Sequence, residues 1–247
     1  VGSEMCIRDR MYGDVMAMVK KQLNDFTLDV AIGGSINDRI TNSTRIDSKN
    51  ASLKYANVFN LANIVMSSSA SIDQKIDAHY QLQSVFATAQ IGYKEGVFLD
   101  LTARNDWSST LAYTKYEKKG FFYPSVGVSF LPDKWVKMPE WVSFSKLRGA
   151  YSIVGNGVPP FITYPVSYVT AGGEILASDA APFAEMKPEM THSVELGMEW
   201  KFLQHRLGLN LTYYRTDTYE QFFKLPALAG DKYAYRYVNA GDIRNQG

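Results

Sequence analysis

The sequence predicts an all-β chain that forms part of an antiparallel, up-and-down transmembrane β-barrel. Three observations lead to this fold class. Apolar and polar residues alternate over long stretches, the connections between these stretches are short at one end and long at the other, and no window of 18 or more consecutive apolar residues could form a membrane-spanning helix. We expect roughly eight strands, and many of them reach the 9–11 residues that a tilted membrane-spanning strand needs.

The first ten residues, VGSEMCIRDR, share neither pattern nor composition with the rest of the chain. They resemble translated sequencing-adapter sequence, so we expect residues 1–10 to be foreign and the native chain to begin near Met11. Cys6 would then not be native, and any signal peptide would have been lost. Residues 11–247 are expected to be one partial β-barrel domain that is truncated at both ends.

Period-two alternation identifies the strands. In the clearest segments every second side chain is apolar, and these segments are residues 26–33, 97–104, 193–202 and 206–214. Weaker alternation covers residues 78–92, 121–131, 144–154 and 235–247. A soluble strand usually has about 5–6 residues, so the length of these segments favours a barrel wall.

Charge separates the two faces of the predicted strands. The apolar positions of 97–104, 193–202 and 206–214 carry no charged side chain, whereas the intervening positions carry several. In a membrane barrel one face of each strand meets lipid and the other lines the lumen. We therefore expect the following polar side chains to face the lumen: Asp100, Arg104, Glu195, Glu199 and Arg206.

The connections differ in length between the two ends of the meander. Residues 94–96 and 203–205 form tight turns, whereas 35–77, 107–120 and 155–189 are long and polar, as in outer-membrane barrels. The exception is 132–143, a long connection at the end that carries the tight turns. Within 55–66, apolar residues recur at helical spacing and predict a short amphipathic helix.

Aromatic residues in the long loops are candidates for contact with a substrate or a lid. Flat rings offer large contact areas at low entropic cost and could stack on a sugar or pack on a peptide. These candidates are Trp107, Tyr113, Tyr116, Phe161, Tyr164, Tyr168, Tyr233 and Tyr235. For each ring, packing within its own loop is the alternative.

Composition and motifs exclude several other classes. The 26 basic and 25 acidic residues leave a net charge of +1, and 46% of the chain is hydrophobic, which argues against disorder and against nucleic-acid binding. One cysteine and three scattered histidines provide neither a disulfide scaffold nor a metal site, and we expect no cofactor. Glu195 and Glu199 lie about 13 Å apart along a strand, which is too far for the carboxylate pair of a glycosidase. Since no other catalytic arrangement stands out, we expect that the protein is not an enzyme.

Several motifs, in order along the chain, resemble the SusC/RagA family of TonB-dependent outer-membrane transporters. Residues 104–111 read RNDWSSTL, 122–126 read FYPSV, 146–151 read KLRGAY, and 239–247 read NAGDIRNQG. The segments 187–189, 195–199 and the Tyr213-Tyr214 pair also fit, whereas Ser145 and Val154 depart from the family pattern. The resemblance covers most of residues 78–247.

The resemblance implies a section of a barrel of about 22 strands in the bacterial outer membrane, whose lumen a plug domain fills. It also implies three kinds of partner: a SusD-like surface lipoprotein that covers the outer mouth, the TonB complex acting through the plug, and an oligosaccharide or peptide substrate. Two alternatives remain open at this point. One is a TonB-dependent receptor for siderophores or cobalamin, and the other is a soluble, secreted β-sandwich that binds carbohydrate.

Overall fold

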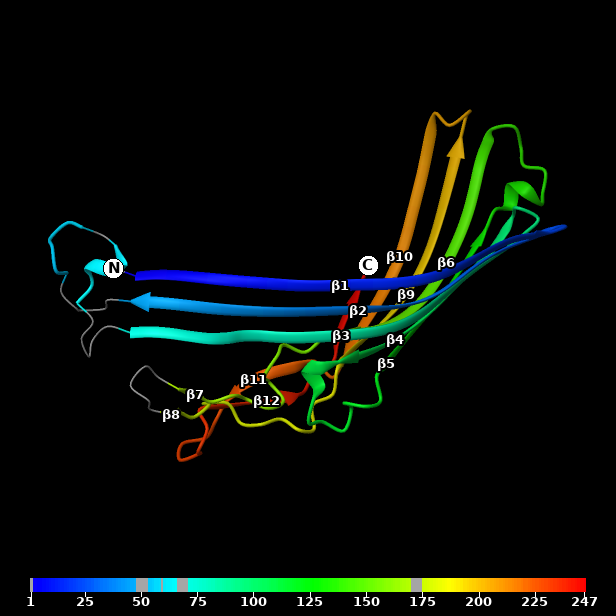
Figure 1. Cartoon of the computed structure of the whole chain (residues 1–247). Coiled ribbons are helices and arrows are strands. Elements are labelled where there is room, and N and C mark those ends of the chain that lie inside the picture. Colours follow the sequence, from blue (N-terminus) through cyan, green and yellow to red (C-terminus); the bar gives the residue numbers. More distant parts are fainter. Residues whose placement is uncertain (1, 48–52, 59, 66–70, 170–174) are drawn as a thin grey trace.

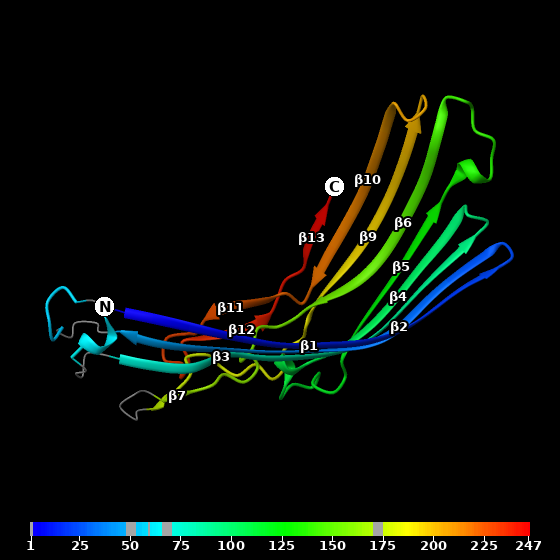
Figure 2. The same cartoon turned by 45° about the horizontal axis from the view of Figure 1, so that its top comes forward.

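The computed structural model describes residues 2–47, 53–58, 60–65, 71–169 and 175–247. Nine antiparallel strands form one continuous sheet in the order β1-β2-β3-β4-β5-β6-β9-β10-β13, and two small hairpins, β7-β8 and β11-β12, lie outside it. Figures 1 and 2 show that this sheet is strongly curved and that it does not close on itself. The all-β, up-and-down barrel prediction is therefore confirmed, with the barrel open in this chain.

The strands of the main sheet are long. Their bounds are β1 (Gly2–Leu23), β2 (Phe26–Asp47), β3 (Ser71–Tyr93), β4 (Val97–Ser108), β5 (Phe121–Phe130), β6 (Val142–Asn156), β9 (Glu189–Phe202), β10 (Leu207–Tyr219) and β13 (Ile243–Gln246). The hairpins comprise β7 (Tyr168–Val169), β8 (Ile175–Leu176), β11 (Phe222–Pro226) and β12 (Tyr235–Asn239). The described helices are three single 3₁₀ turns, η1 (Leu61–Asn63), η2 (Ser109–Leu111) and η3 (Pro132–Lys134), and no described helix is long and apolar enough to cross a membrane.

The connections divide the sheet into two rims. Tight turns join β1 to β2, β3 to β4 and β9 to β10, and we call this end the turn rim. Left-handed backbone at Asn24, Lys94 and Leu203 closes these turns. The connection 131–141, which contains η3, lies on the same rim, as predicted. The opposite end carries the long connections, and we call it the loop rim.

The first three strands extend further than the sequence predicted. β1 and β2 pair along their whole length, from Leu23 with Phe26 to Gly2 with Asp47, so the strand segment 2–23 was missed. β2 continues to Asp47 and β3 begins at Ser71, so the predicted loop 35–77 was far too long. The extensions of β2 and β3 carry polar residues on both faces, as in 37–39 (NDR), whereas β1 has consecutive apolar residues at 15–19 (VMAMV). Neither pattern shows the alternation that identifies a half-buried strand.

Two local predictions were wrong. No amphipathic helix forms in the described part of 55–66, where η1 is a single turn; Phe59 and Met66 lie outside the described residues. Asn63 holds this turn by donating from Nδ2 to the carbonyls of Tyr55 and Val58. The predicted strand 235–247 is two strands in two sheets, because the chain turns at Gly241, whose φ of 119° suits glycine.

Candidate functional site

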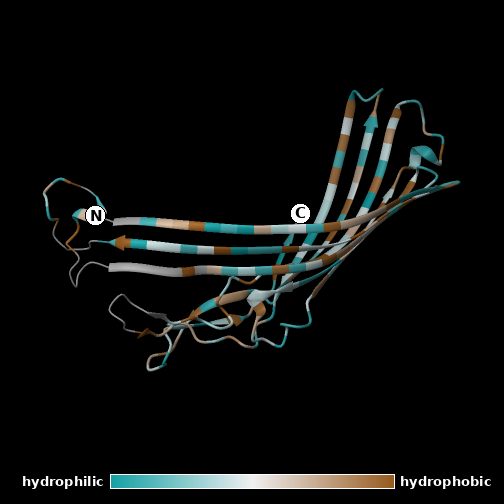
Figure 3. Cartoon of the chain, viewed as in Figure 1, coloured by the Kyte–Doolittle hydropathy of each residue, from teal (hydrophilic) through white to brown (hydrophobic). Residues whose placement is uncertain are grey.

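An apolar band crosses one face of the main sheet. Along β4 every second side chain from Val97 to Ala103 is apolar, and β10 repeats this pattern from Leu207 to Tyr213. The alternating colours along the strands in Figure 3 follow this period. The band is bare in this chain, since Leu211 is 50% exposed. An uncovered apolar face of this size needs an apolar environment.

Polar residues end the band toward the loop rim. On the apolar face, Asp38 follows Ile36 on β2, Asn105 follows Ala103 on β4, and Arg215 follows Tyr213 on β10. The band is thus about one membrane-spanning strand wide, and the sheet continues beyond it.

The opposite, polar face brings two of the predicted lumen residues together. Asp100 and Glu195 occupy one row of paired residues, separated only by Gly127 and Ala150. Because these two residues are small, they leave a hollow of about 250 Å³ that Asp100, Glu195 and Arg148 line. Nη2 of Arg148 lies 3.6 Å from Oε1 of Glu195 and donates to Oγ1 of Thr212 at 2.8 Å. The hollow therefore presents both negative and positive side chains on the polar face of the sheet.

The remaining predicted lumen residues are dispersed. Glu199 pairs with Lys201 at 3.4 Å on the same polar face. Arg104 donates from Nε to Asp106 at 2.7 Å and from Nη2 to Ser84 at 2.8 Å, near the loop rim. Arg206 lies in the turn 203–206, outside the strand that the alternation predicted, because the turn is one residue longer than expected.

The loops of the loop rim pack into a small body with its own core. Leu111, Phe121, Val158, Ile162 and Met186 form this core, and Met186 is completely buried. Polar contacts fix the loops to one another. Oγ1 of Thr163 donates to the carbonyl oxygens of Thr110 and Ala112, and the amide of Ala181 donates to the carbonyl of Tyr235 at 2.9 Å.

A polar clasp joins the last two loops. The Asn239 side chain donates to the carbonyls of Lys187 and Glu220 at 2.9 and 2.6 Å and accepts from the Lys187 amide at 2.9 Å. Lys187 also forms an ion pair with Glu220, whose carboxylate raises the pKa of the Lys187 ammonium. Lys187 is therefore charged at neutral pH, and the clasp holds the 155–189 loop on the β11-β12 hairpin.

A hollow of about 510 Å³ opens among these loops. Tyr164 and Tyr233, two of the predicted aromatic residues, line it together with Pro165, Ser178, Pro182 and Lys232. Tyr113 packs on Tyr164 with ring centroids 5.0 Å apart, so three of the predicted rings meet here. Two flat rings, a hydroxyl and an ammonium group around one hollow suit a ligand that presents both apolar surface and polar groups.

The other predicted aromatic residues have different surroundings. Tyr116 packs against the loop core beside Phe121, and Trp107 lies on β4 opposite Gln83. The Tyr235 ring faces Nζ of Lys224 at 3.6 Å, whereas Phe161 sits in a left-handed turn with φ of 64°. Tyr168 is the first residue of β7. The rings of Trp107, Tyr116, Phe161 and Tyr235 do not line the hollow.

Sequence reasoning missed Arg148 and Lys232, which supply the cations of the two hollows. Arg148 belongs to a strand with weak alternation, and Lys232 is one of several lysines in polar loops. Only the strand register and the loop packing distinguish them from their neighbours.

Comparison with known proteins gives one family. A profile described as "TonB dependent receptor-like, beta-barrel" matches residues 8–247. The TonB-dependent receptor P3 of Formosa agariphila is 25% identical over 177 residues, which cover 68% of this chain and 17% of that protein.

Solved structures share the fold. The RagAB peptide transporter matches with a TM-score of 0.79 at 19% identity, covering 97% of this chain and 28% of that one. The siderophore receptor PirA from Pseudomonas aeruginosa matches with a TM-score of 0.59 at 14% identity, covering 100% of this chain and 39% of that one. The chain thus spans well under half the length of each relative. A β-sandwich is excluded, and the chain belongs to the family of TonB-dependent receptor-like β-barrels.

Proposed function

We propose that this chain is part of a bacterial outer-membrane importer, in which the apolar band faces lipid and the polar face lines a lumen filled by a plug. The observation that supports this most strongly is the division of the nine-stranded sheet into an uncovered apolar face and a charged face. Both signs of charge line the Asp100, Arg148 and Glu195 hollow, which suits contact with a polar plug surface. The TonB complex would then act on the receptor through that plug.

We further propose that the importer takes up oligosaccharides or peptides and works with a SusD-like surface lipoprotein. The better fit to RagAB than to PirA, with TM-scores of 0.79 and 0.59, supports this class over a siderophore receptor. The hollow lined by Tyr164, Tyr233 and Lys232 is open and mixed in character, which suits a chain-like ligand with aromatic-stacking surface and carbonyl or hydroxyl groups. The packed loop body around it provides a surface on which a lipoprotein lid could rest.

Residues 1–10 are, in our proposal, foreign to the receptor, as their composition suggests. Their pairing with β2 uses main-chain groups that any sequence offers, and residues 1–7 lie outside the family match. Long-read sequencing across the locus tests this point and also identifies the adjacent genes. We expect receptor sequence of another composition before Met11 and a SusD-like lipoprotein gene next to it. Recovery of VGSEMCIRDR in uninterrupted genomic reads would refute the proposal.

Removing the rings of the outer hollow should weaken substrate capture. In the complete receptor, Tyr164→Ala combined with Tyr233→Ala should lower oligosaccharide or peptide binding by about tenfold or more, since an aromatic contact contributes roughly 1 kcal/mol. Isothermal titration of the wild-type receptor with peptide and glycan libraries identifies a ligand. Titration of the variant with the same ligand then measures the loss of affinity. Tyr55→Ala, which removes a 72% exposed ring from another loop, is the matched control. Equal affinity of both variants would contradict the assignment, and selective binding of an iron chelate would favour the siderophore class.

A further inference from the structure

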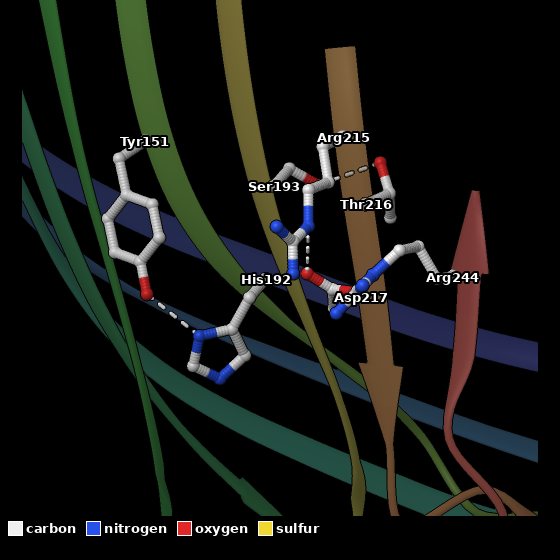
Figure 4. A network of polar contacts seen from close by, with 7 residues as sticks. All are labelled: Tyr151, His192, Ser193, Arg215, Thr216, Asp217 and Arg244. Atoms are coloured by element: carbon white, nitrogen blue, oxygen red, sulfur yellow. Dashed lines mark hydrogen bonds and ion pairs between the residues drawn. The ribbon is translucent and has the colours of Figure 1, made fainter. Parts of the chain in front are cut away.

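Arg215, Asp217 and Arg244 form a cationic cluster, drawn in Figure 4. The cluster lies on the apolar face of the sheet, just beyond the loop-rim end of the band. Nε of Arg215 donates to Oδ2 of Asp217 at 2.8 Å, and Nε of Arg244 donates to Oδ1 of the same carboxylate at 2.5 Å. Two guanidinium groups thus share one carboxylate, which leaves one net positive charge. Among the described residues, the Nη groups of both arginines make no hydrogen bond, and the Arg244 side chain is 56% exposed.

The contact between Tyr151 and His192 connects this cluster to the band. Oη of Tyr151 lies 2.7 Å from Nδ1 of His192, and His192 meets the Tyr219 ring edge-on at 5.3 Å. His192 is also the direct strand partner of Asp217. Tyr151, Val194 and Arg215 form one row of paired residues, so the Tyr151 and Arg215 backbones lie two strand spacings apart, about 10 Å.

The same tyrosine borders an apolar hollow of about 460 Å³ on the band. Ala87 and Ala103 are strand partners and form its low part, because their side chains extend only one carbon from the sheet. Ile32 on one side and Tyr151 on the other rise above them, and the lining is almost entirely apolar. The hollow and the cationic cluster are therefore parts of one continuous surface that Tyr151 joins.

We propose that this surface binds one phosphate-bearing lipid of the surrounding membrane leaflet, with its phosphate on Arg215 and Arg244 and an acyl chain in the hollow. The inference rests on the proposed function, which places this face in lipid. Guanidinium groups bind phosphate oxygens through charge-assisted hydrogen bonds, and tyrosines favour the headgroup level. A free phosphate would leave the hollow empty, and a neutral lipid would leave the net charge uncompensated. Only a ligand that carries both a phosphate and an acyl chain contacts the whole surface.

Native mass spectrometry of the complete receptor tests the proposal, with diphosphorylated lipid A, dephosphorylated lipid A and inorganic phosphate as probes. We expect the diphosphorylated lipid to remain bound to the wild type. Arg215→Gln combined with Arg244→Gln should weaken it by about 30-fold, which corresponds to about 1 kcal/mol for each guanidinium near the membrane surface. Arg236→Gln, which removes an exposed guanidinium from the β11-β12 hairpin, is the matched control and should have no effect.

Filling the hollow provides an independent test. Ala103→Phe should also weaken binding of the diphosphorylated lipid, because the ring occupies the space of the acyl chain, whereas binding of inorganic phosphate should not change. If only the arginine variant weakened binding, or if all three probes bound alike, the one-lipid site would be refuted. Heat-resistant migration of the folded barrel in electrophoresis separates the two proposals. A receptor that never folds into membranes contradicts the proposed function, whereas a folded receptor without this lipid preference contradicts only the site.

Discussion

Leu209→Arg should impair assembly of the complete receptor into membranes. Leu209 occupies the middle of the apolar band on β10, between Leu207 and Leu211, and an arginine at the midplane of a barrel wall costs about 2–4 kcal/mol. The folded fraction, measured by heat-resistant electrophoretic migration after refolding into lipid vesicles, should fall steeply.

The neighbouring position gives the matched control. Asn210 lies on the polar face opposite Glu199, so Asn210→Arg places the new guanidinium beside a carboxylate. This variant should assemble like the wild type. Equal loss in both variants would show that β10 does not separate lipid from lumen.

Met186→Ala should loosen the loop body while leaving the barrel wall intact. Met186 is completely buried among Leu111, Val158 and Ile162, and truncation of such a side chain costs about 2–5 kcal/mol. Since the loop core is small, this loss is a large part of its stability. Hydrogen exchange read by mass spectrometry should accelerate in residues 157–188 and stay unchanged in β9 and β10.

Leu228→Ala is the control for this loss, because Leu228 is 78% exposed in the connection between β11 and β12. It should leave exchange in 157–188 unchanged. Similar exchange in the Met186 and Leu228 variants would contradict the view that the loops fold around a common core. The Tyr164 and Tyr233 hollow depends on that core, so substrate binding should weaken in the Met186 variant alone.

The parts of the fold that the sequence revealed are those where a strand has one apolar and one polar face. Residues 97–104 and 193–202 alternate because one side of the sheet excludes charge, and both became strands of the sheet. Where both faces are polar, as in 38–47 at the end of β2, the pattern disappears although the backbone pairing continues. Residues 55–66 show the opposite case. Tyr55, Val58 and Val65 recur at helical spacing, yet they are exposed, and hydrogen bonds of Asn63 hold the segment as a single turn.

The candidate sites were predicted in part for a similar reason. Sequence spacing placed Asp100 and Glu195 on the polar face, but only the register showed that Gly127 and Ala150 separate them and leave a hollow. Tyr164 and Tyr233 lie far apart in the sequence, and main-chain hydrogen bonds from Ala181 to Tyr235 and from Ala234 to Asp179 join their two loops. Long-range packing of this kind leaves no periodic signal in the sequence.

In the proposed importer, one face of this sheet meets lipid and the other lines an aqueous lumen. Spin labels at single cysteines along β10, at positions 207 to 214 in a cysteine-free background of the complete receptor in vesicles, test this arrangement most directly. We predict that collision with oxygen, which concentrates in lipid, is high at 207, 209, 211 and 213, and that collision with a water-soluble nickel chelate is high at 208, 210, 212 and 214. Uniform accessibility along the strand, or the reverse alternation, would contradict the claim.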